Sequence, residues 1–411
     1  MTILQTLCFR GATSARRFGA LVIFWAALSM ASSAQTFSNL FTFDQGDGAN
    51  PDGRLVQGND GDFYGVTNLG GAYGQGEVYK VTTEGAITVL HSFCNPSDCT
   101  DGSQPAAGLI LGKDGNFYGT TPTNVFEITP SGNLTVLSTS VGSYSPLVQG
   151  NDGNFYGTVQ VDGNSTRKCG GPCGTIFRIT SAGVVTTLHY FKGIDGWSPE
   201  GGLVQGTDGD FYGTTAEGGG YYSGVVFKVS SSGTYTLLHS FTGQMEGCQP
   251  VGELIQGTDG NFYGTTLDCG TKVGDGDGIA YKITPSGRLT ILHSFNATGE
   301  WPRTGLVQAS DGNFYGTTPY GGNSNSSICH PTCGSAYRLT PSGKFSTLYE
   351  FCSQSGCSDG AGPSGSLVQG ADGKLYGATY YGGSTICPPP SSCGTLFTIL
   401  PKLPADPALQ R

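Results

Sequence analysis

One short segment recurs seven times along the chain. In its fourth copy it reads LVQGTDGDFYGTT from Leu203, and the glycine of its Asp-Gly step falls at positions 61, 115, 153, 209, 260, 312 and 373. The mean spacing is about 52 residues. Repeats of roughly 40 to 50 residues that contain several short strands are typical of propeller blades. The period therefore predicts a ring of similar units rather than one ordinary globular core.

Each copy contains four pieces with the composition of strands. In the fourth copy they span 202–206, 210–215, 224–230 and 234–241, and all are rich in Val, Thr, Phe, Tyr and Leu. The sequence TDG joins the first two pieces and SSG joins the last two, which is the chemistry of tight turns. No apolar stripe with helical spacing follows the predicted signal peptide. We predict an all-β, seven-bladed β-propeller of four-stranded antiparallel blades.

The two ends of the repeat region complement each other. The seventh copy stops at Leu400 without its fourth strand, and an unmatched strand, TFSNLFTF, spans 36–43 ahead of the first copy. We expect this N-terminal strand to complete the last blade and close the ring, which leaves no free sheet edge. A single propeller then covers 35–400, with a short tail at 401–411. The expected blade cores are about 55–93, 109–140, 147–191, 203–241, 254–295, 306–351, and 367–400 with 36–43.

The first 34 residues read as a secretory signal. Arg10, Arg16 and Arg17 precede an apolar run over 18–30, and the small residues SSA lie just before Gln35. We expect cleavage after Ala34 and a secreted or surface location, the alternative being an uncleaved anchor. Cleavage changes the net charge from −10 to about −13. This charge argues against nucleic acid and anionic membranes as partners, and no later segment is apolar enough to insert.

Residues that recur in every blade favour a structural interpretation over a catalytic one, because a catalytic group is needed once. The turn aspartate is present in all seven copies, and a histidine recurs in the fourth strand of four of them. We interpret the aspartates as turn formers and the histidines as packed or hydrogen-bonded strand residues. The aspartates are Asp60, Asp114, Asp152, Asp208, Asp259, Asp311 and Asp372, and the histidines are His91, His189, His239 and His293.

Twelve cysteines follow the predicted signal, and they fall into six pairs. An even number in an exported chain predicts disulfides. The expected pairs are Cys94 with Cys99, Cys169 with Cys173, Cys248 with Cys269, Cys329 with Cys333, Cys352 with Cys357, and Cys387 with Cys393. Zinc is the alternative, but the pairs are assigned to different blades, whereas zinc needs four clustered ligands. All twelve fall in loops that share one face of a propeller, where they would stiffen long glycine-rich connections.

The same face carries a recurring acid shortly before a proline. The acids are Asp47, Asp101, Asp195, Glu246, Glu300 and Asp359. One interpretation is a turn that aims the next inner strand, and the other is an acidic collar that binds a cation or a polyhydroxyl ligand. Trp197 and Trp301, with Tyr73, Tyr221, Tyr222, Tyr320, Tyr380 and Tyr381, offer a platform for stacking sugars, or ordinary packing. Asp275 and Asp277 are weak candidates for Ca²⁺, and no other cofactor or metal is indicated.

The motifs GLVQGTDGDFYGTT, GVVFKVSSSG and LLHSF resemble the GloVer-type extracellular tandem-repeat family, over essentially the whole chain after residue 34. The resemblance implies a β-propeller and a secreted or surface location. It supplies no catalytic motif to carry over. Many members carry a C-terminal anchor, and no such anchor is recognisable here.

Three functions remain open from the sequence. A non-catalytic binding module, with a glycan or an extracellular protein as partner, is favoured because no serine elbow, Walker loop or HExxH motif is present. The alternatives are a polysaccharide lyase or glycosidase that uses carboxylates at the channel mouth, and a purely structural matrix component. We expect a monomer. Blade 2 has only PTN between its second and third strands, which predicts a notch in the loop face.

Overall fold

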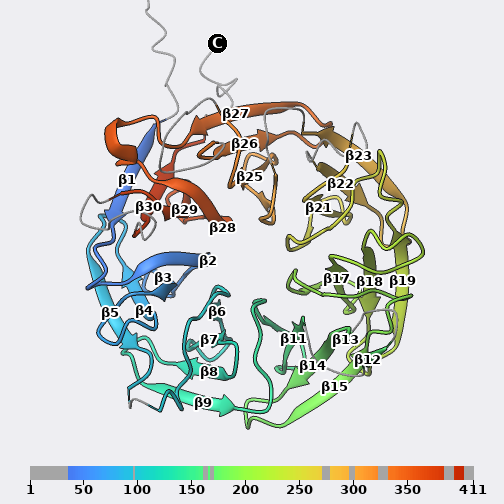
Figure 1. Ribbon diagram of the computed structural model, residues 1–411, viewed down its shortest axis with the longest axis horizontal. Coiled ribbons are helices and arrows are strands. Elements are labelled where there is room, and N and C mark those ends of the chain that lie inside the picture. Colours follow the sequence, from blue (N-terminus) through green and yellow to red (C-terminus); the bar gives the residue numbers. More distant parts are fainter. Residues whose placement is uncertain are drawn as a thin grey trace, which may run out of the picture. The chain divides into compact units, whose positions relative to one another are not determined.

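The computed structural model of the chain contains seven four-stranded antiparallel sheets arranged in a ring (Figure 1). The structure describes residues 36–95, 98–160, 173–270, 278–295, 301–322, 332–383 and 393–401, and the backbone of 165–166 and 171–172. The first strand of each blade lies nearest the centre and the fourth lies outermost (Figure 1). The predicted fold class, an all-β seven-bladed propeller, is therefore confirmed.

The strands follow the chain blade by blade. Blade 1 contains β2 (Ala49–Gln57), β3 (Phe63–Leu69), β4 (Glu77–Val81) and β5 (Ile87–Ser92), and blade 2 contains β6 (Ile110–Leu111), β7 (Phe117–Thr120), β8 (Val125–Ile128) and β9 (Leu134–Ser138). Blade 3 contains β10 (Val148–Gln149), β11 (Phe155–Val159), β14 (Thr175–Ile179) and β15 (Val185–Tyr190), and blade 4 contains β16 (Val204–Gln205), β17 (Phe211–Thr215), β18 (Val225–Val229) and β19 (Tyr235–Ser240).

The remaining three blades repeat the pattern. Blade 5 contains β20 (Ile255–Gln256), β21 (Phe262–Thr266), β22 (Ile279–Ile283) and β23 (Leu289–Ser294), and blade 6 contains β24 (Val307–Gln308), β25 (Phe314–Thr318), β26 (Ser335–Leu339) and β27 (Phe345–Glu350). Blade 7 contains β28 (Ala361–Gln369), β29 (Leu375–Tyr381), β30 (Thr395–Ile399) and β1 (Phe37–Thr42). The sequence did not predict the hairpin β12 (Ser165–Thr166) and β13 (Gly171–Pro172), or the short 3₁₀ turn η1 (Ser355–Cys357). None of the helical structure in the described ranges is of a kind that spans a membrane.

Ring closure occurs at blade 7. Strand β1, from the N-terminal end of the described chain, pairs antiparallel with β30, and Phe37 lies opposite Ile399 (Figure 1). Phe43, just after β1, meets the ring of Tyr79 edge-on at 5.3 Å. Phe241 meets Tyr281 in the same way, also at 5.3 Å. The N-terminal strand thus makes the same contact with the next blade that the fourth strand of another blade makes.

Aromatic rings hold neighbouring blades together. The tyrosine of one FYG segment stacks on the phenylalanine of the next, as Tyr156 does on Phe211 with ring centroids 3.9 Å apart. The contact recurs around the ring and includes the closing pair Tyr376 and Phe63 at 4.0 Å. In blade 7 a leucine, Leu375, takes the place of the phenylalanine. These buried contacts form the core, which is distributed between blades rather than gathered at one place.

On the face that carries the Asp-Gly turns, the same tyrosine–aspartate hydrogen bond forms in every blade. In each turn the second-strand tyrosine donates its hydroxyl proton to the aspartate four residues earlier, at 2.6 to 2.9 Å. The other oxygen of Asp208 accepts the N–H of Asp210, and Gly209 supplies the positive φ of 88° that the turn requires. The structural interpretation of the recurring aspartates is correct.

A glutamine at the end of the inner strand links each turn to the next blade. Gln205 donates to the carbonyl of Gly209 in its own turn and accepts the N–H of Asn151 from the turn of blade 3. Six glutamines make this pair of bonds: Gln57, Gln149, Gln205, Gln256, Gln308 and Gln369. Blade 2 has Leu111 at the equivalent position.

Candidate functional site

The central channel opens on the loop face into a cavity of about 750 Å³. Its wall comes mainly from the residues that precede the leucine of the LVQG motif, and all seven blades contribute. These segments are Asp52–Arg54, Ala106–Gly108, Tyr144–Pro146, Glu200–Gly201, Val251–Glu253, Arg303–Gly305 and Ser364–Ser366. We call them the channel segments. A pocket of this size is in the usual range for small-ligand sites.

The middle residue of each channel segment is small because the inner strands approach one another closely. A Cβ atom on Gly365 would lie 2.2 Å from the carbonyl oxygen of Gly53 in the adjoining blade. A Cβ atom on Gly252 would lie 2.8 Å from the carbonyl oxygen of Thr304. The fold therefore restricts the middle position, whereas the first position carries a different side chain in every blade.

An ion pair crosses the channel. The Nη1 atom of Arg54 in blade 1 lies 3.3 Å from Oε2 of Glu253 in blade 5, and both side chains are partly buried. These two blades are not neighbours in the ring, so the pair connects opposite sides of the wall. It neutralises two of the charges that face the cavity.

Asp52 is the acid of the cavity with the most altered ionisation. Burial raises its pKa to about 6, against the opposing effects of the Gly53 N–H and the charge of Arg303. The Gly53 N–H donates to the Asp52 carboxylate at 2.8 Å. Burial, and then the charge of Asp52, raise the pKa of the Tyr380 hydroxyl. The guanidinium of Arg303 and the phenol of Tyr380 thus lie near enough to Asp52 to interact with its charge.

Tyrosines from blades 6 and 7 form one side of the cavity. Tyr320, Tyr380 and Tyr381 all line it, and the rings of Tyr380 and Tyr381 meet at 4.8 Å. Trp301 lies against Tyr320 with ring centroids 5.2 Å apart and is itself 41% exposed. On another part of the wall Tyr144 is 55% exposed. Aromatic faces and hydroxyl groups are therefore open to a ligand in the cavity.

Polar side chains complete the wall between blades 3 and 4. Gln160 donates to the carboxylate of Glu200 at 2.9 Å and to the hydroxyl of Ser198 at 3.0 Å. Ser145 donates to the backbone carbonyl of Glu200 at 2.7 Å. These bonds fix the Glu200 carboxylate at the cavity wall, where it remains able to accept further hydrogen bonds.

The described acids among those predicted to form a collar lie outside this cavity. Asp101 accepts the N–H of Cys94 at 3.0 Å and lies 2.9 Å from Nε2 of His91 in the outermost strand β5. Asp195 lies 3.1 Å from Nε2 of His189 in β15. Burial opposes ionisation of Asp195, but the hydrogen bonds from His189 and a backbone N–H lower its pKa. Such bonds hold the start of each loop against the outer strand, as expected of a structural turn.

The other described acids of this set make related contacts. Asp359 accepts the hydroxyl proton of Tyr349 in β27 at 2.7 Å, Glu246 lies 3.6 Å from His239, and Asp47 accepts the N–H of Asp44. None of the five described acids, from Asp47 to Asp359, lines the cavity. Their role in ligand binding stays a prediction, and Glu300 lies outside the described residues.

The predicted aromatic platform is divided in the same way. Tyr320 lines the cavity, and Trp301 packs against the ring of Tyr320 without lining the cavity itself. Trp197 packs against the core between blades 3 and 4. Tyr222 is 60% exposed and does not line the cavity. The weak Ca²⁺ candidates, Asp275 and Asp277, lie outside the described residues.

Disulfides stiffen the loop face. Cys94–Cys99, Cys248–Cys269 and Cys352–Cys357 are bonded as the sequence predicts. Cys173, Cys333 and Cys393 are also disulfide-bonded, and their expected partners Cys169, Cys329 and Cys387 lie outside the described residues.

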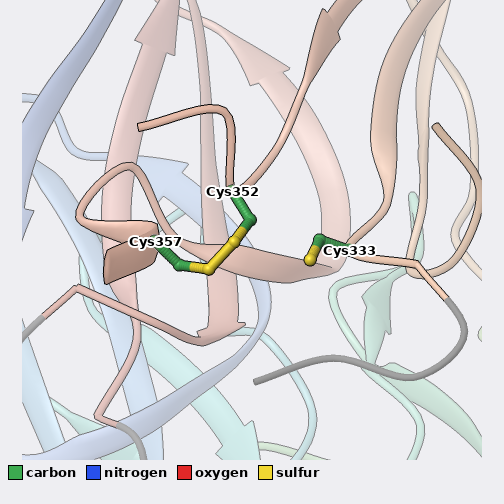
Figure 2. A group of neighbouring side chains, drawn as sticks. All are labelled: Cys333, Cys352 and Cys357. Atoms are coloured by element: carbon green, nitrogen blue, oxygen red, sulfur yellow. A yellow bond between two sulfur atoms is a disulfide. The ribbon is translucent and has the colours of Figure 1, made fainter. Parts of the chain in front are cut away.

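Figure 2 shows Cys333 beside the disulfide between Cys352 and Cys357, and the three Sγ atoms lie within 4.8 Å of one another. We assigned these pairs to separate blades, but the loops before β26 and after β27 bring them together on blade 6. All three sulfurs belong to disulfides, which leaves no thiolate to bind a metal.

A family model described as the Gloeobacter/Verrucomicrobia repeat matches residues 26–144, 142–332 and 203–405. The chain belongs to this family. No curated protein matches the chain. The resemblance drawn from the DGDFYGTT and VVFKVSSSG motifs is thus confirmed for this Gloeobacter/Verrucomicrobia repeat protein.

Solved propellers show the same fold with little sequence identity. A streptogramin B lyase is similar with a TM-score of 0.60 at 14% identity, over 90% of this chain and 99% of the lyase. Virginiamycin B lyase from Staphylococcus aureus gives 0.60 at 16% identity, over 89% and 99%. The extracellular domain of a putative hybrid two-component system from B. thetaiotaomicron gives 0.55 at 12% identity, over 92% of this chain and 42% of that one. At such identities the likeness concerns the fold alone.

The cavity residues Asp52, Arg54, Tyr144 and Arg303 were missed from the sequence of this repeat protein. A signal for them exists in the repeats themselves. When the seven copies are aligned on LVQG, the turn and the second strand are nearly constant, whereas the first channel-segment residue is Asp, Ala, Tyr, Glu, Val, Arg or Ser. Variation at positions that the fold leaves open marks the wall of the channel.

Proposed function

We propose that the protein is an extracellular, non-catalytic binding propeller and that a glycan occupies the cavity at the loop-face end of its channel. One observation carries the proposal: the blades are nearly identical where they pack, and they differ where they face the cavity. The side chains that face the cavity are not needed for packing between blades, so they are available to contact a ligand. A binding site on variable segments of a rigid scaffold is a common arrangement in such folds.

The chemistry of the wall favours a polyhydroxyl ligand. Tyr144, Tyr320, Tyr380 and Tyr381 offer flat apolar faces together with hydroxyl groups. Glu200 and Asp52 offer hydrogen-bond acceptors, and Arg303 offers donors. A ligand with alternating apolar faces and hydroxyl groups matches both sets. A protein partner on the same face is the other outcome that a binding screen would reveal.

A glycan-array screen with the protein from residue 35 onward tests this proposal, with affinities then measured by calorimetry. We expect binding that falls at least about tenfold in Tyr320→Ala, equivalent to about 1.4 kcal/mol. Tyr222→Ala is the matched control, because this tyrosine is exposed on the same face but lies outside the cavity. Equal losses in both variants, or no binding to any glycan, would contradict the proposal.

A catalytic function at the same cavity is the second candidate, and Asp52 is the observation that favours it. A carboxyl group whose pKa is about 6 is suited to acid-base work near neutral pH. Arg303 and Tyr380 lie near enough to affect or respond to its charge. Reducing-sugar release from any bound polysaccharide, lost in Asp52→Asn with binding retained, would favour a lyase or glycosidase over a pure binding module.

A location outside the cytoplasm is part of the proposal. It is supported by the disulfides, because such bonds persist in oxidising compartments. It is also supported by the signal-like first 34 residues. Detection of the processed chain, beginning at Gln35, in the culture medium or at the cell surface tests it. Retention in the cytoplasm with free thiols would contradict it.

A further inference from the structure

The described side chains that line the cavity differ in size around the ring. Blade 6 contributes Pro319, Tyr320 and Thr332 from the connection between its second and third strands, and blade 7 contributes Tyr380 and Tyr381. Blade 2 contributes only the residues of its channel segment. Large side chains therefore stand on one side of the cavity, and small ones on another.

The connection between the second and third strands is shortest in blade 2. Strand β7 ends at Thr120 and β8 begins at Val125, so four residues lie between them, against seven in blade 1 and nine in blade 4. The turn is closed by the Thr121 N–H, which donates to the carbonyl of Asn124. Both residues are buried, and Thr123 between them is exposed. The short connection therefore forms a tight turn, and the notch in the loop face stays a prediction.

The channel segment of blade 2 is also the one with the smallest side chains. It consists of Ala106, Ala107 and Gly108, and Gly108 is packed so closely that a Cβ atom would lie 2.5 Å from the carbonyl oxygen of Arg54. No charged or aromatic side chain stands between the cavity and the turn at Thr123 within these two segments. Tyr144, on the neighbouring channel segment of blade 3, is more than half exposed beside this path.

We propose that the ligand is a linear polysaccharide, held by an internal or terminal portion in the cavity and leaving it across blade 2. This inference rests on the proposed function. A cavity of about 750 Å³ encloses a ligand of drug-like size, so the rest of a longer chain must pass over the rim. Blade 2 has the shortest connection and the smallest lining side chains, and Tyr144 offers a ring face there for one further sugar. The tyrosines of blades 6 and 7 hold the opposite end.

Chain-length dependence of affinity tests this inference. The probes are oligomers of roughly two to eight sugar units prepared from cellulose, xylan and alginate, titrated into the protein from residue 35 onward. We expect affinity to rise at least about tenfold between two and six units for the polysaccharide that binds. The same affinity for two and for six units would overturn the inference and leave the proposed function intact. No binding by any of these oligomers would also overturn the inference, while the glycan-array screen tests the proposed function separately.

The variant Thr123→Trp tests whether the polysaccharide leaves the cavity across blade 2. A bulky side chain at this exposed position should lower the affinity for the six-unit oligomer about tenfold, while the two-unit oligomer loses less than about twofold. Ser131→Trp is the matched control, because Ser131 is an exposed turn residue on the opposite face of the same blade, and it should affect neither. Equal effects of Thr123→Trp on both oligomers, or no effect on either, would place the chain elsewhere. If this variant folds poorly, the affinities of the unaltered protein for the two-unit and six-unit oligomers still test the inference.

Discussion

On the turn face, six blades place a glutamine that makes the same two hydrogen bonds, and all seven place an aspartate that accepts the same tyrosine hydroxyl. On the loop face, the first residue of the channel segment is Asp52 in blade 1, Tyr144 in blade 3 and Arg303 in blade 6. The first region repeats because every blade must meet the same neighbour. The second is free of that requirement, and its variation is what we expect if one ligand touches each blade once. Repetition within this chain therefore separates scaffold from site.

The largest effect should come from breaking the repeated scaffold. Phe211 is fully buried and stacks on Tyr156 at 3.9 Å, so Phe211→Ala removes a large side chain and leaves a cavity. We expect the free energy of unfolding to fall by about 3–5 kcal/mol in urea or guanidinium titrations. Phe262→Ala should cost a similar amount, because Phe262 makes the same 3.9 Å stack with Tyr212. A loss under about 1 kcal/mol in either variant would mean that the stacks do not hold the blades together.

Asp52→Asn should raise the free energy of unfolding, unlike the two phenylalanine variants, and the gain should depend on pH. Burial raises the pKa of Asp52 from its usual 3.8 to about 6, so the folded protein favours the neutral acid. Above pH 6 the carboxylate must be ionised in a site that disfavours charge, which lowers stability; below pH 3.8 both states are protonated and no effect remains. We expect the variant to be more stable at pH 7.5 by at most about 3 kcal/mol.

The measurement is a pair of denaturant titrations of each protein, at pH 7.5 and pH 3.5. The advantage of Asp52→Asn should disappear at the lower pH. An advantage of the same size at both values would show that charge burial is not its cause.

Gln205→Ala tests how much the repeated glutamine hydrogen bonds of the turn face contribute to stability. It removes one bond within its own turn and one from the Asn151 N–H in the turn of the preceding blade. We expect a loss of about 1–2 kcal/mol, together with faster hydrogen exchange at the Asn151 amide. Unchanged exchange at that amide would show that the glutamine does not couple the blades. Ligand affinity should not change.

Tyr222→Ala should have the smallest effect. Tyr222 lies on the loop face, but it is largely exposed and stands outside the cavity. We expect unfolding free energy to change by less than about 0.5 kcal/mol and ligand affinity to stay within about twofold. A clear loss of binding would show that the site extends to the outer loops, as the sequence alone had suggested.

The repeat made most of the fold predictable. Seven Asp-Gly turns gave the number of blades, and the unmatched strand at 36–43 gave the closure, because strand periodicity and turn residues are local signals. The site was harder to predict. The spacing of Asp101 and Asp195 before a proline suggested a ligand site. In the structure these two carboxylates accept loop N–H groups and pair with His91 and His189.

The cavity wall depends on which side chains the ring places opposite one another. Arg54 and Glu253 are 199 residues apart in sequence and meet only because blades 1 and 5 face each other across the channel. No local pattern carries such information. The variable first and last residues of the channel segments would have marked these positions, since they differ from blade to blade while the LVQG motif that follows is nearly constant.

The most direct test of the central claim exchanges one channel segment for another. Asp52→Ser combined with Arg54→Ser gives blade 1 the Ser-Gly-Ser segment that blade 7 already has at 364–366. Unfolding free energy and affinity for the best-bound glycan are measured on the same sample. If scaffold and site are separate, stability should not fall by more than about 1 kcal/mol while affinity falls at least about tenfold. Retained affinity, or a loss of affinity that only accompanies unfolding, would contradict the claim.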